Sequence, residues 1–100
     1  MSATVTVILW RDIPAQVVAK SGRTTWKIEL PPRFAQAVDR AAMRAGSIGS
    51  DEYLEEWRRE TRPCPDNLEA EAQAEADALD ARFTLEVLNE YVLNNGYRGE

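Results

Sequence analysis

The first third of the chain alternates apolar and polar residues with the period of a β-strand. Residues 4–10 carry apolar side chains on both faces of such a strand, which is typical of a strand covered on both sides. Residues 24–30 alternate cleanly, and Ser21-Gly22 supplies a turn that pairs them with residues 15–20 in a hairpin. Residues 15–20 also fit one helical turn, because Pro14 suits a helix start. The pattern predicts an antiparallel sheet of two or three strands.

Beyond residue 30 the apolar positions recur with the period of an amphipathic helix. The first predicted helix begins at Pro32, runs to Ala45 and ends at Gly46, because proline suits a first turn and glycine a C-terminal cap. Its buried stripe is expected to comprise Phe34, Val38, Ala41, Ala42 and Ala45. A second helix is predicted over residues 52–61, with Tyr53, Leu54 and Trp57 on one side.

The last third of the chain predicts one long helix. Residues 66–69 (Asp-Asn-Leu-Glu) match a capping box, and the helix is expected to run to about Asn95. Its apolar seam comprises Leu68, Ala72, Ala76, Leu79, Phe83, Val87 and Tyr91. The first half consists of alanine and acidic residues, so it offers little apolar area for packing and either lies on the domain or projects from it. We therefore expect an α+β domain over residues 1–62, with helices on one face of the sheet, and an acidic helix over residues 63–100.

The charge distribution limits the classes of partner. Residues 1–62 carry ten Lys and Arg against eight Asp and Glu, whereas residues 63–100 carry two against nine. The first segment is too weakly basic for duplex nucleic acid, and the second repels phosphate. The apolar runs are far shorter than a membrane span and no secretory signal opens the chain, so we expect a cytoplasmic protein that binds neither nucleic acid nor membrane.

The residue types also limit the possible chemistry. The chain has no histidine and one cysteine, Cys64, which excludes the usual zinc sites and the catalytic sets that use histidine as base. No loop has the spacing of an EF-hand or of a glycine-rich phosphate cradle. Every Asp and Glu lies in a polar pattern, whereas acid–base catalysis needs a desolvated carboxyl. We therefore expect a protein that is not an enzyme and that binds neither a metal ion nor a cofactor.

The segment that ends the first strand, residues 10–16, is the leading candidate for a binding site. It places Trp10, Arg11, Asp12 and Gln16 where a chain leaves the rim of a sheet, and exposed Trp and Arg are enriched among interface anchors. The alternative is structural: the tryptophan covers the sheet end, while the two charged residues pair locally or satisfy loop backbone groups.

A second candidate is a pair of arginines, Arg40 and Arg44, one turn apart on the first helix. Guanidinium groups match carboxylates and phosphates, so the pair is a candidate cationic patch. The alternative is that both belong to the solvated face of an amphipathic helix.

Three motifs in order support a family resemblance: Trp-Arg-Asp-Ile-Pro-Ala-Gln-Val at 10–17, Arg-Phe through Ala-Met-Arg-Ala-Gly at 33–46, and Tyr-Leu through Glu-Trp at 53–57. With them the chain resembles the small bacterial family called virulence factor, whose domain also occurs in longer conserved virulence factor C proteins. The resemblance covers roughly residues 3–62 and carries no catalytic residues with it. In the family that the chain resembles, genes of small stand-alone members are neighbours of folate- and corrinoid-dependent methyl-transfer genes. The resemblance therefore implies an accessory role in one-carbon metabolism.

We therefore expect a non-catalytic accessory or adaptor protein of a bacterial cytoplasmic pathway, which binds a partner protein through residues 10–16 and the Arg40 and Arg44 face. One alternative is a module that binds a small anion, such as a folate-like molecule, with Trp10 and the same two arginines. Another is self-association into a homo-oligomer through the apolar face of the C-terminal helix.

Overall fold

The structure, a computed structural model, describes residues 3–46, 49 and 51–98. Its elements are β1 (Ala3–Trp10), β2 (Ile13–Ser21), β3 (Thr24–Glu29), α1 (Pro32–Ala45), α2 (Asp51–Glu55), β4 (Trp57–Cys64), α3 (Leu68–Arg82) and α4 (Leu85–Leu93). The strands form one antiparallel sheet in the order β3-β2-β1-β4. The predicted α+β class is confirmed, but the sheet has four strands instead of two or three.

Residues 15–20 belong to β2 and do not form the helical turn that was the alternative. Val17 lies opposite Val7 of β1 and is fully buried, so the strand contributes directly to the core. The register shifts by one residue at Ala15, which has no opposite residue in β1. Such a bulge near the start of a strand accommodates Pro14, which has no N–H to give to the ladder.

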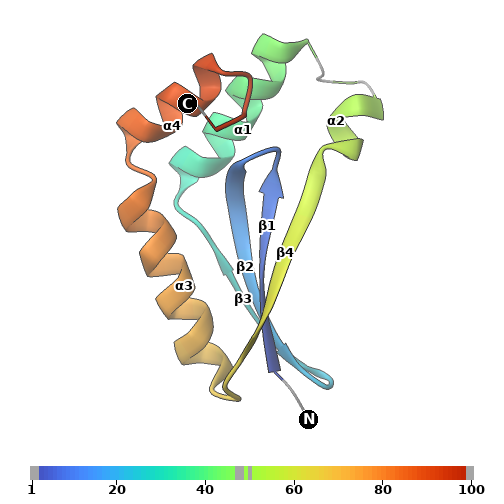
Figure 1. Ribbon diagram of the computed structural model, residues 1–100, viewed down its shortest axis with the longest axis vertical. Coiled ribbons are helices and arrows are strands. Elements are labelled where there is room, and N and C mark those ends of the chain that lie inside the picture. Colours follow the sequence, from blue (N-terminus) through green and yellow to red (C-terminus); the bar gives the residue numbers. More distant parts are fainter. Residues whose placement is uncertain (1–2, 47–48, 50, 99–100) are drawn as a thin grey trace.

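The helices lie on one face and at one end of the sheet. Figure 1 shows α3 running beside the strands, while α1 and α4 lie together near the sheet end that α2 also adjoins. The face of α3 toward the sheet contributes Leu68, Ala72, Ala76 and Leu79 to the core. The alanines at this interface are small, which lets the helix backbone approach the sheet closely. Among the acidic residues of α3, Glu69, Asp77 and Asp80 are exposed, whereas Glu75 is half-buried and lies toward β4.

The predicted second helix is wrong over most of its length. Helix α2 ends at Glu55, and residues 57–64 form β4, which pairs with β1 from Trp57 opposite Trp10 to Cys64 opposite Ala3. The reason is tertiary: the second edge of β1 has backbone donors and acceptors that need a partner, and this pairing outweighs local helix preference. Pro63 is also compatible with an edge strand and not with a helix interior.

The predicted long C-terminal helix is two helices, separated at Phe83 and Thr84. The Thr84 hydroxyl caps α4 by accepting a hydrogen bond from Val87 N at 3.2 Å. Phe83 is buried between the rings of Phe34 and Tyr91, at centroid distances of 6.0 and 5.2 Å. The break turns α4 onto α1, so the apolar face of α4 is buried within the same chain.

The start of α3 also differs in detail from the expected capping box. The helix does begin at Leu68, but the Asn67 side chain makes no capping hydrogen bond. No helix in the described ranges is long and apolar enough to cross a membrane.

Candidate functional site along strand β4

The prediction that Trp10 and Arg11 face solvent is wrong. Trp10 is fully buried, and only 6% of Arg11 is exposed. The Trp10 indole donates from Nε1 to the Tyr53 carbonyl oxygen at 2.9 Å. The Arg11 guanidinium lies between two aromatic rings, 4.7 Å from the Trp10 ring and 4.6 Å from the Tyr97 ring. This stacking places a charged group inside the fold, where cation–π contacts offset part of its lost hydration.

Hydrogen bonds from Arg11 join three segments that are distant in sequence. Its Nη1 donates to the Asn95 carbonyl oxygen at 2.7 Å and its Nη2 to Glu52 Oε1 at 3.2 Å. Its backbone N–H donates to the Glu56 carbonyl oxygen at 3.0 Å. Arg11 has φ +53, a left-handed conformation that allows the chain to turn from β1 into β2 within two residues. We call the group formed by Trp10, Arg11, Asn95, Gly96 and Tyr97 the Arg11 clasp; Trp10, Arg11 and Gly96 are buried in it, whereas Asn95 and Tyr97 are partly open to solvent.

Asp12 connects this clasp to the edge strand β4. Its Oδ1 accepts from Arg58 Nη2 at 2.9 Å, and its Oδ2 accepts from the backbone N–H of Arg98 at 2.7 Å. Arg58 Nε donates to the Arg11 carbonyl oxygen at 2.8 Å. Hydrogen bonding to Glu60 and Asp12 outweighs burial and raises the pKa of Arg58 above its ordinary value. Arg58 is therefore a fixed cation, with its donors already committed to the protein.

A cleft runs between β4 and the helices α3 and α4, and we call it the β4 cleft. It consists of two adjoining hollows of about 310 and 230 Å³, both lined by Val7, Glu60 and Glu75. Apolar side chains line it beneath a charged rim. The apolar lining residues are Val5, Val7, Leu9, Pro14, Leu79, Phe83 and Tyr91, and the charged ones are Asp12, Arg58, Glu60, Arg62, Glu75, Arg82 and Arg98.

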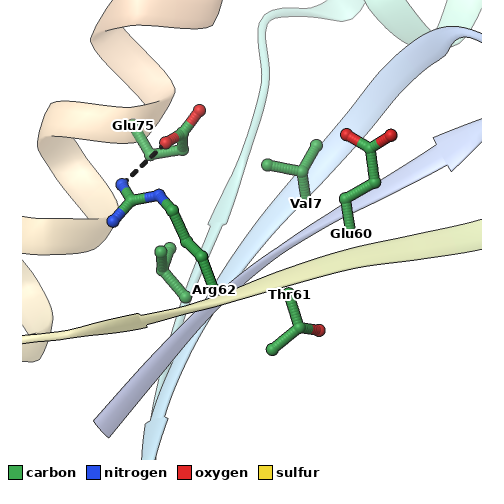
Figure 2. A pocket seen from close by; sticks show the side chains of 6 residues that line it. Val7, Glu60, Thr61, Arg62 and Glu75 are labelled. Atoms are coloured by element: carbon green, nitrogen blue, oxygen red, sulfur yellow. Dashed lines mark hydrogen bonds and ion pairs between the residues drawn. The ribbon is translucent and has the colours of Figure 1, made fainter.

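The charged groups of the β4 cleft differ in how far the protein neutralises them. Figure 2 shows Arg62 reaching from β4 toward Glu75 on α3, to which it donates at 2.9 Å. Glu75 raises the pKa of Arg62 through this hydrogen bond. Within the part of the chain that the structure describes, the guanidinium groups of Arg82 and Arg98 have no acceptor; Arg82 lies 5.4 Å from the Phe83 ring. These two cations are available to a ligand.

The outer edge of β4 is a separate surface. In the described residues β4 pairs only with β1, which leaves its other edge without a strand. Pro63, opposite Thr4, has no N–H, so its nitrogen faces this outer edge, as proline in an edge strand requires. By the alternation of an antiparallel ladder, the backbone groups of Thr61 and Arg59 also point outward. The Arg11 N–H that donates to the Glu56 carbonyl fits the same alternation.

The remaining predicted site residues lie elsewhere. Arg40 Nη1 donates to Asn89 Oδ1 at 2.9 Å, and Arg44 Nε donates to the Leu93 carbonyl oxygen at 3.2 Å. Both arginines are exposed, and both bind α4. A cation at the C-terminal end of α4 is favourable because the helix dipole is negative there. Gln16 is half-buried on β2 and borders a different hollow from the β4 cleft.

Sequence reasoning missed the residues that build the β4 cleft. The sequence analysis placed Arg58 and Arg59 in the helix predicted over residues 52–61, because the strand itself was not predicted. Only the alternation of Arg58, Glu60 and Arg62 before Pro63 indicates that these charges share one face of a strand. No comparable sequence pattern indicates that Arg82 and Arg98 lie near β4, because only the packing of the helices brings them there.

Within the described ranges, no group of three or more His, Cys, Asp or Glu residues is placed to hold a metal ion. No curated protein and no solved structure shows significant similarity to the chain. The sequence profile described as virulence factor matches residues 8–92, a range that contains the Arg11 segment, β4, α3 and most of α4. The chain therefore belongs to the virulence factor family.

Proposed function

We propose that the protein is a non-catalytic accessory protein of a bacterial cytoplasmic pathway, with one-carbon metabolism as the proposed pathway, and that it acts by binding a partner protein. The proposed binding surface is the outer edge of β4, and the proposed ligand is an extended, acidic segment of the partner. The single observation that carries this proposal is the outer edge of β4, which pairs with no strand in the described part of the chain and belongs to a strand with three arginines in an otherwise acidic chain.

The backbone supports strand addition at this edge. The outward N–H and C=O groups of Arg59 and Thr61 are the groups that an added strand would pair with. Residues 58–63 are all exposed, so side chains of an added strand meet no steric barrier there. Main-chain hydrogen bonds supply affinity in this mode, while neighbouring side chains supply specificity.

The charges favour an acidic partner over a second copy of the chain. Two copies of β4 that pair antiparallel through their outer edges, centred on Glu60, place Glu60 opposite Glu60 and Arg58 opposite Arg62, and like charges opposite each other destabilise a strand pair. An acidic segment instead meets Arg59, whose guanidinium has no acceptor within the described residues. Arg59 and Thr61 lie on the open face of the sheet, opposite Ile8 and Thr6 of β1.

The test uses a pair of variants that differ mainly in one outward N–H. Thr61→Pro removes the N–H, while Thr61→Val keeps it; both lose the hydroxyl contact to Thr6 Oγ1, which is 2.9 Å long. Each form is tagged in the native bacterium and purified, and stoichiometric co-purifying protein is quantified. We expect wild type and Thr61→Val to retain the same partner, and Thr61→Pro and Arg59→Glu to lose it.

Several results contradict the proposal. Absence of any stoichiometric partner from the wild type argues against an accessory protein. A partner retained equally by Thr61→Pro places the binding surface elsewhere. Sedimentation of the purified chain tests the competing occupant: a dimer that Thr61→Pro dissociates assigns the edge to a second copy. Equal thermal unfolding of the two Thr61 variants shows that the comparison concerns binding and not folding.

A further inference from the structure

We infer that the β4 cleft is a second binding site, distinct from the outer edge of the strand, and that it accepts a small molecule with a flat apolar body and one carboxylate. The inference rests on the lining of the cleft and on its uncommitted cations, and it does not depend on the proposed function. The cleft and the outer edge use different atoms of β4: the side chains of Glu60 and Arg62 line the cleft, with Thr61 at its border, whereas the backbone groups of Arg59 and Thr61 face outward.

The hollow of about 230 Å³ suits an apolar ring. Leu9, Leu79 and Phe83 line it, and each is at most 6% exposed, so these side chains are held in place by the core behind them. The Tyr91 ring meets the Phe83 ring edge-on at 5.2 Å and forms a further aromatic wall. Small-molecule sites combine a mainly apolar lining with a few fixed polar groups, and the volumes of the two hollows lie at or just below the lower end of their usual range.

The charge of the cleft selects a monoanion. Its lining contains four arginines and three carboxylates, which leaves one net positive charge. Arg58 and Arg62 are already bound to carboxylates of the protein, whereas Arg82 and Arg98 have guanidinium groups without an acceptor in the described segments. A single ligand carboxylate can accept charge-assisted hydrogen bonds from the guanidinium groups of Arg82 and Arg98. A dianion such as phosphate would also meet repulsion from Asp12, Glu60 and Glu75.

The Arg11 clasp positions this site. Asp12 holds the backbone of Arg98 beside Arg58, and the Arg11 carbonyl and Asp12 carboxylate fix the Arg58 guanidinium. Arg98 follows directly after Tyr97, whose ring covers Arg11. The segment that sequence analysis selected as an exposed binding site thus acts through the groups that it orients in the cleft.

The experiment compares a matched pair of aromatic probes. 2-Naphthoate carries the carboxylate, and 2-naphthamide has the same rings without the charge. Each is titrated to millimolar concentration into the isotope-labelled full chain, and the methyl resonances of Val7, Leu9 and Leu79 are followed by NMR. We expect saturable shifts at these methyls, with at least tenfold weaker binding for the amide.

The variants separate charge recognition from folding and from partner binding. The double variant Arg82→Gln with Arg98→Gln is expected to weaken naphthoate binding at least tenfold, while the matched control Arg23→Gln, in the distant β2–β3 turn, leaves it unchanged. Arg59→Gln should also leave it unchanged, because Arg59 lies on the open face of the sheet and lines neither hollow of the cleft.

Three results overturn the inference: no saturable binding of naphthoate, equal affinity for the two probes, or equal affinity of wild type and the double variant. Shifts confined to methyls outside the cleft overturn it as well. A protein that loses its partner on Thr61→Pro yet fails these tests retains the proposed function and lacks the second site.

Discussion

Replacing Arg11 by methionine tests the assignment of this residue as a buried structural cation. Methionine keeps the aliphatic stem between the rings of Trp10 and Tyr97 but removes the charge and all five donors. In the structure the change deletes the hydrogen bonds to the Asn95 carbonyl and to Glu52, and both cation–π contacts.

The magnitude follows from the individual contacts. A hydrogen bond from a charged donor contributes about 1.5–3 kcal/mol, and a desolvated cation–π contact contributes up to about 2 kcal/mol. The Asn95 carbonyl is also left without this donor. An opposing gain comes from removing a guanidinium whose buried Nε has no acceptor in the described residues. We expect a net loss of about 2–4 kcal/mol, a large fraction of the stability of a domain of this size.

The assay is urea unfolding, with the free energy of unfolding compared at equal m value. Arg40→Met is the matched control, because Arg40 is exposed and its side chain makes one hydrogen bond within the described residues, to Asn89. The loss of stability in this variant is expected to stay within about 0.5 kcal/mol. If Arg11→Met lowers the free energy of unfolding by less than about 1 kcal/mol, the clasp does not stabilise the fold as argued.

Two further predictions concern backbone space and thiol reactivity. At Gly96, which has φ +93, an added Cβ would lie 2.8 Å from Trp10 Cζ3, so Gly96→Ala is expected to lower the free energy of unfolding by about 2 kcal/mol or more. At Gly46, where no atom of the described residues lies within 4 Å of such a Cβ, the loss is expected to be about 1 kcal/mol. Thermal unfolding compares the two variants, and equal losses refute the close contact. Burial, and then the nearby Glu71 carboxylate, raise the pKa of Cys64 above its ordinary value. The thiolate is therefore scarcer at a given pH than for a free thiol, and the alkylation rate should rise at higher pH in the folded chain. Glu71→Gln is expected to shift that rise to lower pH. An unchanged pH profile contradicts the contribution assigned to the Glu71 carboxylate.

Local periodicity determined the parts of the fold whose partners lie close in sequence. The alternation in residues 4–10 and 24–30, and the turn near Ser21-Gly22, predicted the hairpin region, because side chains on a strand repeat every two residues wherever one face is buried. Helix α1 was predicted over residues 32–45 because proline, glycine and the apolar stripe all agreed on its bounds. The ordered motifs also sufficed for the family, since they need no spatial arrangement.

Strand β4 and the break before α4 were decided by tertiary contacts. Residues 57–64 have no apolar alternation, and they become a strand because β1, some fifty positions earlier, offers an unpaired edge. Phe83 interrupts the helical seam because its ring packs against Phe34 of α1. In both cases the energy of a long-range contact exceeds a local preference of a few tenths of a kcal/mol per residue.

The candidate sites were also determined partly by the sequence and partly by the tertiary structure. The sequence alone marked Trp10, Arg11 and Asp12 as unusual, but residue type does not say whether an arginine is solvated or stacked inside the fold. The environment of the Arg11 side chain depends on the Tyr97 ring and the Asn95 carbonyl, which belong to the C-terminal end of the chain. The β4 cleft likewise exists only after strand pairing and helix packing bring its charges together, because a binding site depends on distances in space and a sequence records only distances along the chain.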